Sequence, residues 1–137
     1  MFLLFENNQN LFAVDINDVK SIFLTKKIYP LPFFENILVG VSNIKGDLYP
    51  IFNINYLFKF PNVSISRKLI LLHNEYNFIL TSDGKIKIES DLGEKIENSN
   101  NNEFITNIFK KDEQLVYNLN LENIKKLIAQ TLSKEAQ

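Results

Sequence analysis

Residues 38–54 read Leu-Val-Gly-Val-Ser-Asn-Ile-Lys-Gly-Asp-Leu-Tyr-Pro-Ile-Phe-Asn-Ile, and they decide the fold of this chain. Two apolar strand candidates flank a tight polar turn from Asn43 to Asp47. Gly46 is the natural residue for a left-handed backbone position at the corner that follows Lys45. The stretch therefore predicts a β-hairpin. It contains no recognised catalytic motif, so the function that it indicates is binding.

The segments on either side of this hairpin carry proline and asparagine signals. Pro30 and Pro32 predict an extended connector before the hairpin, because proline lacks the N–H that a helix interior needs. Pro50 in the returning strand predicts a sheet edge or a β-bulge. Asn53 is a good N-cap, and we expect it to begin a single helical turn that ends at Phe58.

Short β-prone runs recur along the rest of the chain and are separated by Asn-rich or charged turns. We expect further strands over residues 2–5, 11–16, 69–72, 76–80, 86–88, 104–109 and 114–119. About nine short strands at close spacing favour small β-barrels or a sandwich over βαβ units. The predicted fold class is therefore mostly β, and no internal repeat is strong enough to claim from the sequence.

Helical spacing of apolar residues appears in two places. Asn17 can cap a short helix over residues 18–23, and Asn120 can cap an amphipathic C-terminal helix over about 121–133. Residues 97–103 are rich in Asn and almost free of apolar side chains, so we expect an exposed mobile loop there.

The length and composition indicate one folded domain over residues 1–137. The chain has 137 residues, of which 45% are hydrophobic and 12% aromatic, and this apolar content places it outside the disordered class. That length supports one core, or two small subdomains that share one, but not two independent domains of ordinary size.

Charge and cysteine usage exclude several classes of function. Fifteen Lys and Arg residues stand against 16 Asp and Glu, so no excess of positive charge is available for nucleic acid. Cysteine is absent and His73 is the only histidine, so we expect no metal site and no cofactor, and the cytoplasm is the default location. The N-terminus lacks the pattern of a signal peptide, and no apolar run approaches the roughly 18 to 20 residues that a membrane helix requires, so no direct membrane insertion is expected.

The hairpin resembles the signature segment of the CheW-like domain family of chemotaxis coupling proteins. That family typically shows Gly-Val-x-Asn-x-Arg-Gly followed by Pro-x-x-Asp-Leu, and this chain has Gly40-Val-Ser-Asn-Ile-Lys-Gly followed by Pro50-Ile-Phe-Asn-Ile. Phe12-Ala-Val-Asp-Ile and Ile28-Tyr-Pro-Leu-Pro also match the family pattern. The resemblance covers residues 2–58 and resumes over 104–128, whereas only the strand rhythm agrees between them.

The resemblance implies two five-stranded β-barrel subdomains around a shared core, with short helices and a C-terminal helix. It also implies a non-catalytic adaptor that couples the cytoplasmic tip of chemoreceptors to the regulatory domain of the histidine kinase CheA, and that is recruited to membrane-associated receptor arrays. Carried over by position, the residues implicated in receptor or kinase binding are Val19, Gly40, Asn43, Lys45 and Gly46. Lys45 stands where arginine is usual, so the positive charge remains but bidentate hydrogen bonding is lost.

Other interpretations remain open at this point. The Asn43–Gly46 segment is also a good hairpin turn without any binding role, and Val19 is also an ordinary core residue. Within the adaptor class, the chain could serve another motility or signalling array. A small β-barrel that binds a ligand or an oligonucleotide is the alternative from a different class, and the balanced charge argues against it. An enzyme ranks last because no catalytic motif is present.

Overall fold

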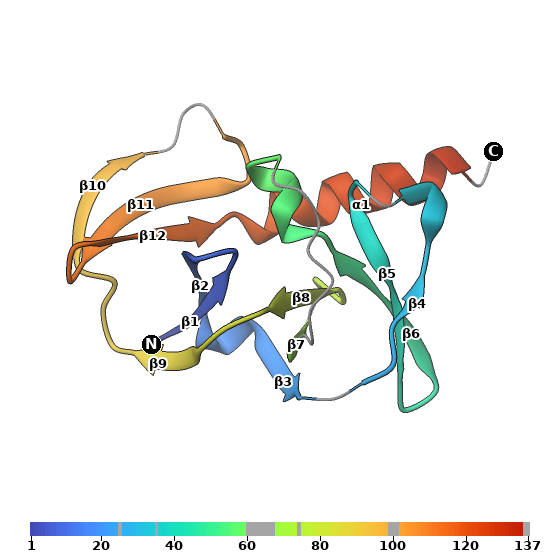
Figure 1. Ribbon diagram of the computed structural model, residues 1–137. Helices are drawn as coiled ribbons and strands as arrows, with labels where there is room; N and C mark the ends of the chain where they lie inside the picture. Colours follow the sequence, from blue (N-terminus) through green and yellow to red (C-terminus); the bar gives the residue numbers. More distant parts are fainter. Residues whose placement is uncertain (25, 35, 60–67, 74, 99–101, 136–137) are drawn as a thin grey trace.

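The chain folds into two six-stranded β-sheets and one C-terminal helix, which confirms the predicted mostly β class (Figure 1). A computed structural model describes residues 1–24, 26–34, 36–59, 68–73, 75–98 and 102–135. The first sheet contains β1 (Phe2–Asn7), β2 (Asn10–Asp15), β9 (Ile86–Glu89), β10 (Glu94–Asn98), β11 (Ile105–Lys111) and β12 (Gln114–Leu119). The second sheet contains β3 (Val19–Phe23), β4 (Tyr29–Pro30), β5 (Leu38–Ile44), β6 (Asp47–Phe52), β7 (Lys68–Leu72) and β8 (Ile79–Ser82).

The two sheets have the same topology. The first runs β10-β11-β12-β2-β1-β9, and the second, taken from the other end, runs β4-β5-β6-β8-β7-β3. In both, the third and fourth strands of this order are parallel and the remaining pairs are antiparallel. The two end strands are consecutive in the chain in each case, β9 with β10 and β3 with β4. The fold therefore contains a structural repeat that the sequence alone does not reveal.

The repeat extends to the register of the two long hairpins. Leu38 pairs with Phe52 and Ile105 pairs with Leu119, and a β-bulge follows immediately in both cases. Each hairpin closes with a two-residue turn whose residues both have positive φ, and each is followed by an asparagine N-cap. The same local chemistry thus builds one hairpin in each sheet.

Each sheet curves around its own small apolar cluster. The cluster of the first sheet contains Leu4, Leu11, Ala13, Leu92 and Val116. The cluster of the second sheet contains Ile44, Ile51, Leu69, Leu71 and Ile79. The strand members of each cluster lie on neighbouring strands, β12, β2 and β1 in the first sheet and β5, β6, β8 and β7 in the second. The two sheets, each with its own cluster, form the two subdomains that we expect. Each has six strands where the resemblance implies five.

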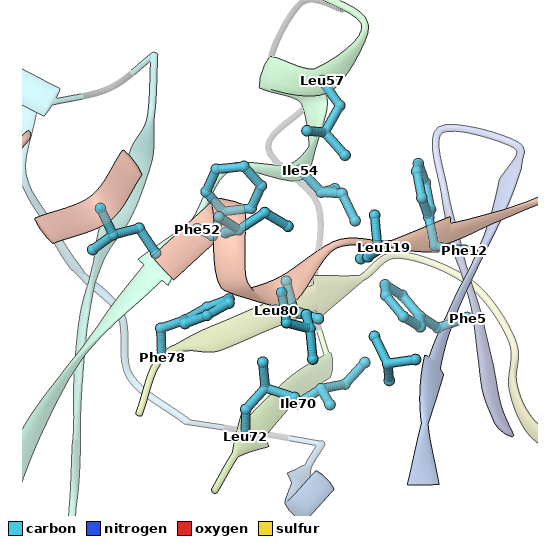
Figure 2. Close-up of a cluster of buried hydrophobic side chains, with 14 of the residues drawn as sticks. Phe5, Phe12, Phe52, Ile54, Leu57, Ile70, Leu72, Phe78, Leu80 and Leu119 are labelled. Atoms are coloured by element: carbon cyan, nitrogen blue, oxygen red, sulfur yellow. The ribbon is translucent and has the colours of Figure 1, made fainter. Parts of the chain in front are cut away.

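A third and larger cluster, the shared core, lies between the two sheets (Figure 2). Strands of both sheets bury both of their faces to form it. On β1, Leu3 and Phe5 point into the shared core while Leu4 points into the cluster of its own sheet. On β7, Ile70 faces the shared core and Leu71 faces the cluster of the second sheet. This arrangement explains why these strands read as continuous apolar runs rather than as alternating ones.

The C-terminal helix α1 (Leu121–Glu135) covers the shared core (Figure 1). Asn120 precedes it, and its side-chain oxygen accepts a hydrogen bond from the N–H of Asn123 at 3.1 Å, as an N-cap does. Ile124 and Ile128 are buried one turn apart on the face that meets the core.

Hydrogen bonds at one edge of the shared core also join the two sheets. The Asn7 side chain on β1 donates to the backbone oxygen of Thr81 on β8, and the Ser82 hydroxyl donates to the Glu6 backbone oxygen at 2.8 Å. Asn7 and Ser82 are both buried, so their polar groups would lower the stability of the fold if they had no hydrogen-bond partner.

The short helix expected over residues 18–23 is wrong. The structure has a 3-10 turn over Ile16–Asp18 followed by strand β3, and Asp15, not Asn17, is the N-cap. The side chain of Asp15 accepts a hydrogen bond from the N–H of Asn17 at 2.9 Å. Pairing with β7, in which Ile22 lies opposite Ile70, outweighs a helical spacing of only three apolar residues.

Three other local predictions also need correction. The stretch expected to be a loop over 97–103 begins inside β10, and residues 99–101 lie outside the described part of the chain. Its charged residues suit an edge strand, which needs little apolar content.

The proline connector forms strand β4 and then a 3-10 turn over Pro32–Phe34. Pro50 lies in an interior strand, but β6 pairs with β8 only at Ile51, so no ladder on that side needs a donor from Pro50.

The shared core yields a direct test with Phe12. Its ring is buried and lies 5.9 Å from the ring centroids of both Phe5 and Tyr117. We expect Phe12→Ala to lower the free energy of unfolding by about 3–5 kcal/mol, measured by urea denaturation, because it leaves a cavity between the sheets. Phe33, whose side chain is 86% exposed, provides the control, and Phe33→Ala should change stability by less than about 0.5 kcal/mol. Equal effects of the two substitutions would contradict the assignment of the core.

Candidate functional site

The corner between β5 and β6 is a tight and well-defined turn. Lys45 and Gly46 have φ values of 54° and 93°, and positive φ at both central residues is the signature of the type I′ turn. The side-chain oxygen of Asn43 accepts a hydrogen bond from the Gly46 N–H at 2.9 Å. This bond fixes the corner, and it explains why an asparagine stands three residues before the glycine.

The corner projects from a buried base. Ser42 and Ile44 are buried on β5, whereas the Asn43 and Lys45 side chains are exposed. On the returning strand, Leu48 is 64% exposed. Strand alternation therefore anchors one face in the cluster of the second sheet and presents a cation and an apolar side chain to solvent.

Gly40 is buried and acts through packing. A Cβ atom at this position would lie 2.9 Å from the carbonyl carbon of Tyr29 and 3.1 Å from the Cα of Pro30, both on the neighbouring strand β4. Contacts of this kind with backbone cannot be relieved by a rotamer change. Glycine at position 40 is therefore the condition for β4 to lie against β5.

Val19 lies apart from the other four predicted site residues. It is the first residue of β3, pairs with Leu72 on β7, and packs half-buried against the shared core. In the sheet order, β7, β8 and β6 separate β3 from β5. The structure thus brings Gly40, Asn43, Lys45 and Gly46 together on one hairpin, whereas Val19 is on another surface.

A cleft of about 310 Å³ opens between the end of β2, the start of α1 and the β7–β8 connection. Asp18, the residue before Val19, lines it, whereas Val19 itself does not. The cleft is lined by Phe2, Val14, Asp15, Asp18, Tyr76, Thr106, Asn118, Leu119, Asn120, Leu121 and Glu122. Its lining comes from several elements that are distant in sequence, which is why sequence reasoning did not find it. Three carboxylates, those of Asp15, Asp18 and Glu122, give it an acidic lining above an apolar base.

The electrostatics of this cleft centre on Asp18. Burial, and then the neighbouring carboxylate of Asp15, raise the pKa of Asp18 above its ordinary value, although His73 opposes the shift. Burial also raises the pKa of Tyr76, and Asp18 adds to that shift. The backbone oxygen of Asp18 accepts a hydrogen bond from the His73 N–H at 3.0 Å, which fixes the turn beside the β7–β8 connection.

The described residues offer neither a metal-binding group of three or more His, Asp or Glu side chains nor a helix long and apolar enough to cross a membrane. The side chains at the corner and in the cleft are suited to hydrogen bonding, ion pairing and apolar contact. The arrangement can therefore hold a macromolecular partner.

Sequence reasoning missed the surface formed by the connector before β5. Tyr29 is 44% exposed, and the Lys27 ammonium lies 5.0 Å from the centroid of its ring. The backbone oxygen of Lys27 accepts a hydrogen bond from the Ser42 hydroxyl at 3.0 Å. The only signal in the sequence was Gly40 itself. Its meaning becomes evident only when β4 is seen to pair with β5, because the close approach of the two strands is a tertiary contact.

The raised pKa of Asp18 predicts a pH-dependent effect of Asp18→Asn. At neutral pH the carboxylate is charged in both states, and the folded state carries the cost of its burial, so the variant should have a higher free energy of unfolding than the wild type. As pH falls through the raised folded pKa and then the unfolded value, the carboxyl becomes neutral in both states and the difference should disappear. Urea denaturation of both proteins from pH 7 to pH 3 measures it, because the unfolded value is 3.8. A difference that stays constant over this range would contradict the assignment.

Comparison with known proteins gives the family. The CheW-like domain model matches residues 1–128. The crystal structure of the scaffolding protein TtCheW from Thermoanaerobacter tengcongensis is similar, with a TM-score of 0.68, 18% sequence identity, and coverage of 87% of each chain. At that identity the structural likeness shows the fold alone, and none of the curated proteins matches this chain. Because the family match spans nearly the whole sequence, this chain belongs to the CheW-like domain family.

Proposed function

We propose that this protein is a non-catalytic adaptor that couples the cytoplasmic tip of chemoreceptors to the regulatory domain of the histidine kinase CheA. The observation that carries the proposal is the hydrogen-bonded, exposed corner Asn43–Gly46 in a CheW-like fold. A corner that is held by its own hydrogen bond and that exposes a cation is suited to a partner rather than to a reaction. The protein works in the cytoplasm as a single unit over residues 1–137.

Two separate surfaces support this role. The corner with Lys45 belongs to the second sheet, and the cleft beside Val19 lies where the first sheet, α1 and the β7–β8 connection meet. The shared core fixes these surfaces relative to each other, so one molecule can hold two partners in constant register. Contacts of this kind draw their affinity from a few exposed apolar or aromatic anchors within a polar rim.

Lys45 contributes to the corner as a point charge. A lysine ammonium attracts a carboxylate but lacks the planar fork that arginine offers, so the contact depends more on ionic strength and less on geometry. We expect the affinity for the receptor to fall as salt concentration rises.

The test is a calorimetric titration of the protein against a purified receptor cytoplasmic fragment and, separately, against the regulatory domain of the kinase. We expect specific binding to each. A protein that binds neither the receptor fragment nor the kinase domain would contradict the proposed function.

Lys45→Glu tests the corner within that assay. Because Lys45 is exposed and has no described ion pair, we expect the variant to bind the receptor fragment at least about tenfold more weakly, while the thermal midpoint stays nearly unchanged. Lys126→Glu, an exposed charge reversal on α1, is the matched control and should bind like the wild type. A large loss of stability in Lys45→Glu would mark Lys45 as structural instead.

A further inference from the structure

The connector at the edge of the second sheet is a basic and aromatic surface that none of the predicted site residues occupies. The Lys27 ammonium lies over the Tyr29 ring, and the Lys26 ammonium lies 5.2 Å from the centroid of the Phe23 ring. Each aromatic ring thus holds a cation at the surface in a defined position.

This connector and the β5–β6 corner form one continuous edge. Tyr29 pairs with Val41, and Pro30 pairs with Gly40. The Ser42 hydroxyl then donates to the backbone oxygen of Lys27, so the connector continues alongside β5 in the direction of the corner. We define the connector patch as Lys26, Lys27 and Tyr29, and the corner with Lys45 continues the same edge.

Among the described residues, the connector patch and the adjoining corner carry a net positive charge, with Lys26, Lys27 and Lys45 against Asp47. None of the ion pairs in the described part of the chain involves Lys26, Lys27 or Lys45, and Asp47 is the acidic residue of the same corner. The whole chain carries a formal net charge of -1, so this edge differs in sign from the protein as a whole. An acidic partner segment complements such a surface.

We propose that Tyr29 and Lys27 contact an acidic segment of the receptor tip, and that Gly40 is a positioning residue that places them. The inference rests on the proposed function. Gly40 is buried and has no side chain, so it makes no side-chain contact with a partner. A methyl group there would collide with the backbone of Tyr29 and Pro30 and would displace β4 together with the exposed ring.

Tyr29→Ala provides the principal test, by titration against the receptor cytoplasmic fragment. We expect at least about tenfold weaker binding, because an exposed aromatic anchor and the position of its cation are lost together. Tyr29→Phe retains the ring and should bind like the wild type. Phe33→Ala removes a still more exposed aromatic ring from the neighbouring 3-10 turn and should also leave binding unchanged. Binding to the kinase regulatory domain should be the same for all of these proteins.

Gly40→Ala tests the positioning role. The single variant should weaken receptor binding, and the double variant Gly40→Ala/Tyr29→Ala should bind no more weakly than the weaker of the two single variants, because both act on one contact. Additive losses would show that Gly40 acts independently of Tyr29 and would overturn the positioning role.

The outcomes separate this inference from the proposed function. Normal receptor binding by Tyr29→Ala, or a loss confined to the kinase domain, would overturn the inference while leaving the adaptor role intact. A wild-type protein that binds neither partner would contradict the proposed function itself. If Tyr29→Ala lowers the thermal midpoint, Lys27→Gln serves in its place, since it removes only an exposed charge, and unchanged receptor binding by that variant would overturn the inference.

Discussion

The structure depends on strands that bury both of their faces. β1, β2, β7 and β8 each contribute side chains to the shared core on one face and to the cluster of their own sheet on the other. A sheet of six short strands encloses only a few apolar residues by itself, too few to offset the entropy of ordering its chain. Joining the two sheets back to back through the shared core supplies the missing burial.

This constraint gives the proposed function its mechanical basis. The corner at Lys45 and the cleft beside Val19 lie on different parts of the same packed body. The hydrogen bond from Ser82 to Glu6 helps to join the two sheets of that body. An adaptor has to keep its partners in a fixed relative position. A core shared by the two sheets serves this purpose because it limits the motion of one sheet relative to the other. Local contacts also hold the corner and its neighbour strand in place. Asn43 accepts a hydrogen bond from the Gly46 N–H, and Gly40 lets β4 pack closely against β5.

Much of the fold could be predicted from the sequence, because turns and caps depend on neighbouring residues. The Lys45-Gly46 corner and the Asn53 cap are local features, and the structure has both. The strand β3 could not be predicted, because its conformation is decided by pairing with β7, far along the chain. The structural repeat also escaped detection, since equivalent positions such as Gly40 and Asn107 share a register position but not a residue type. The role of the five site residues stays a prediction.

Hydrogen exchange under native conditions tests the shared core most directly. If both sheets depend on it, the slowest amides of β1 and β7 should open with the same free energy, equal to that of global unfolding, because neither sheet survives alone. Amides of one of these strands that exchange through an opening several kcal/mol less costly than the other would show that the two subdomains unfold independently. That result would contradict the central claim.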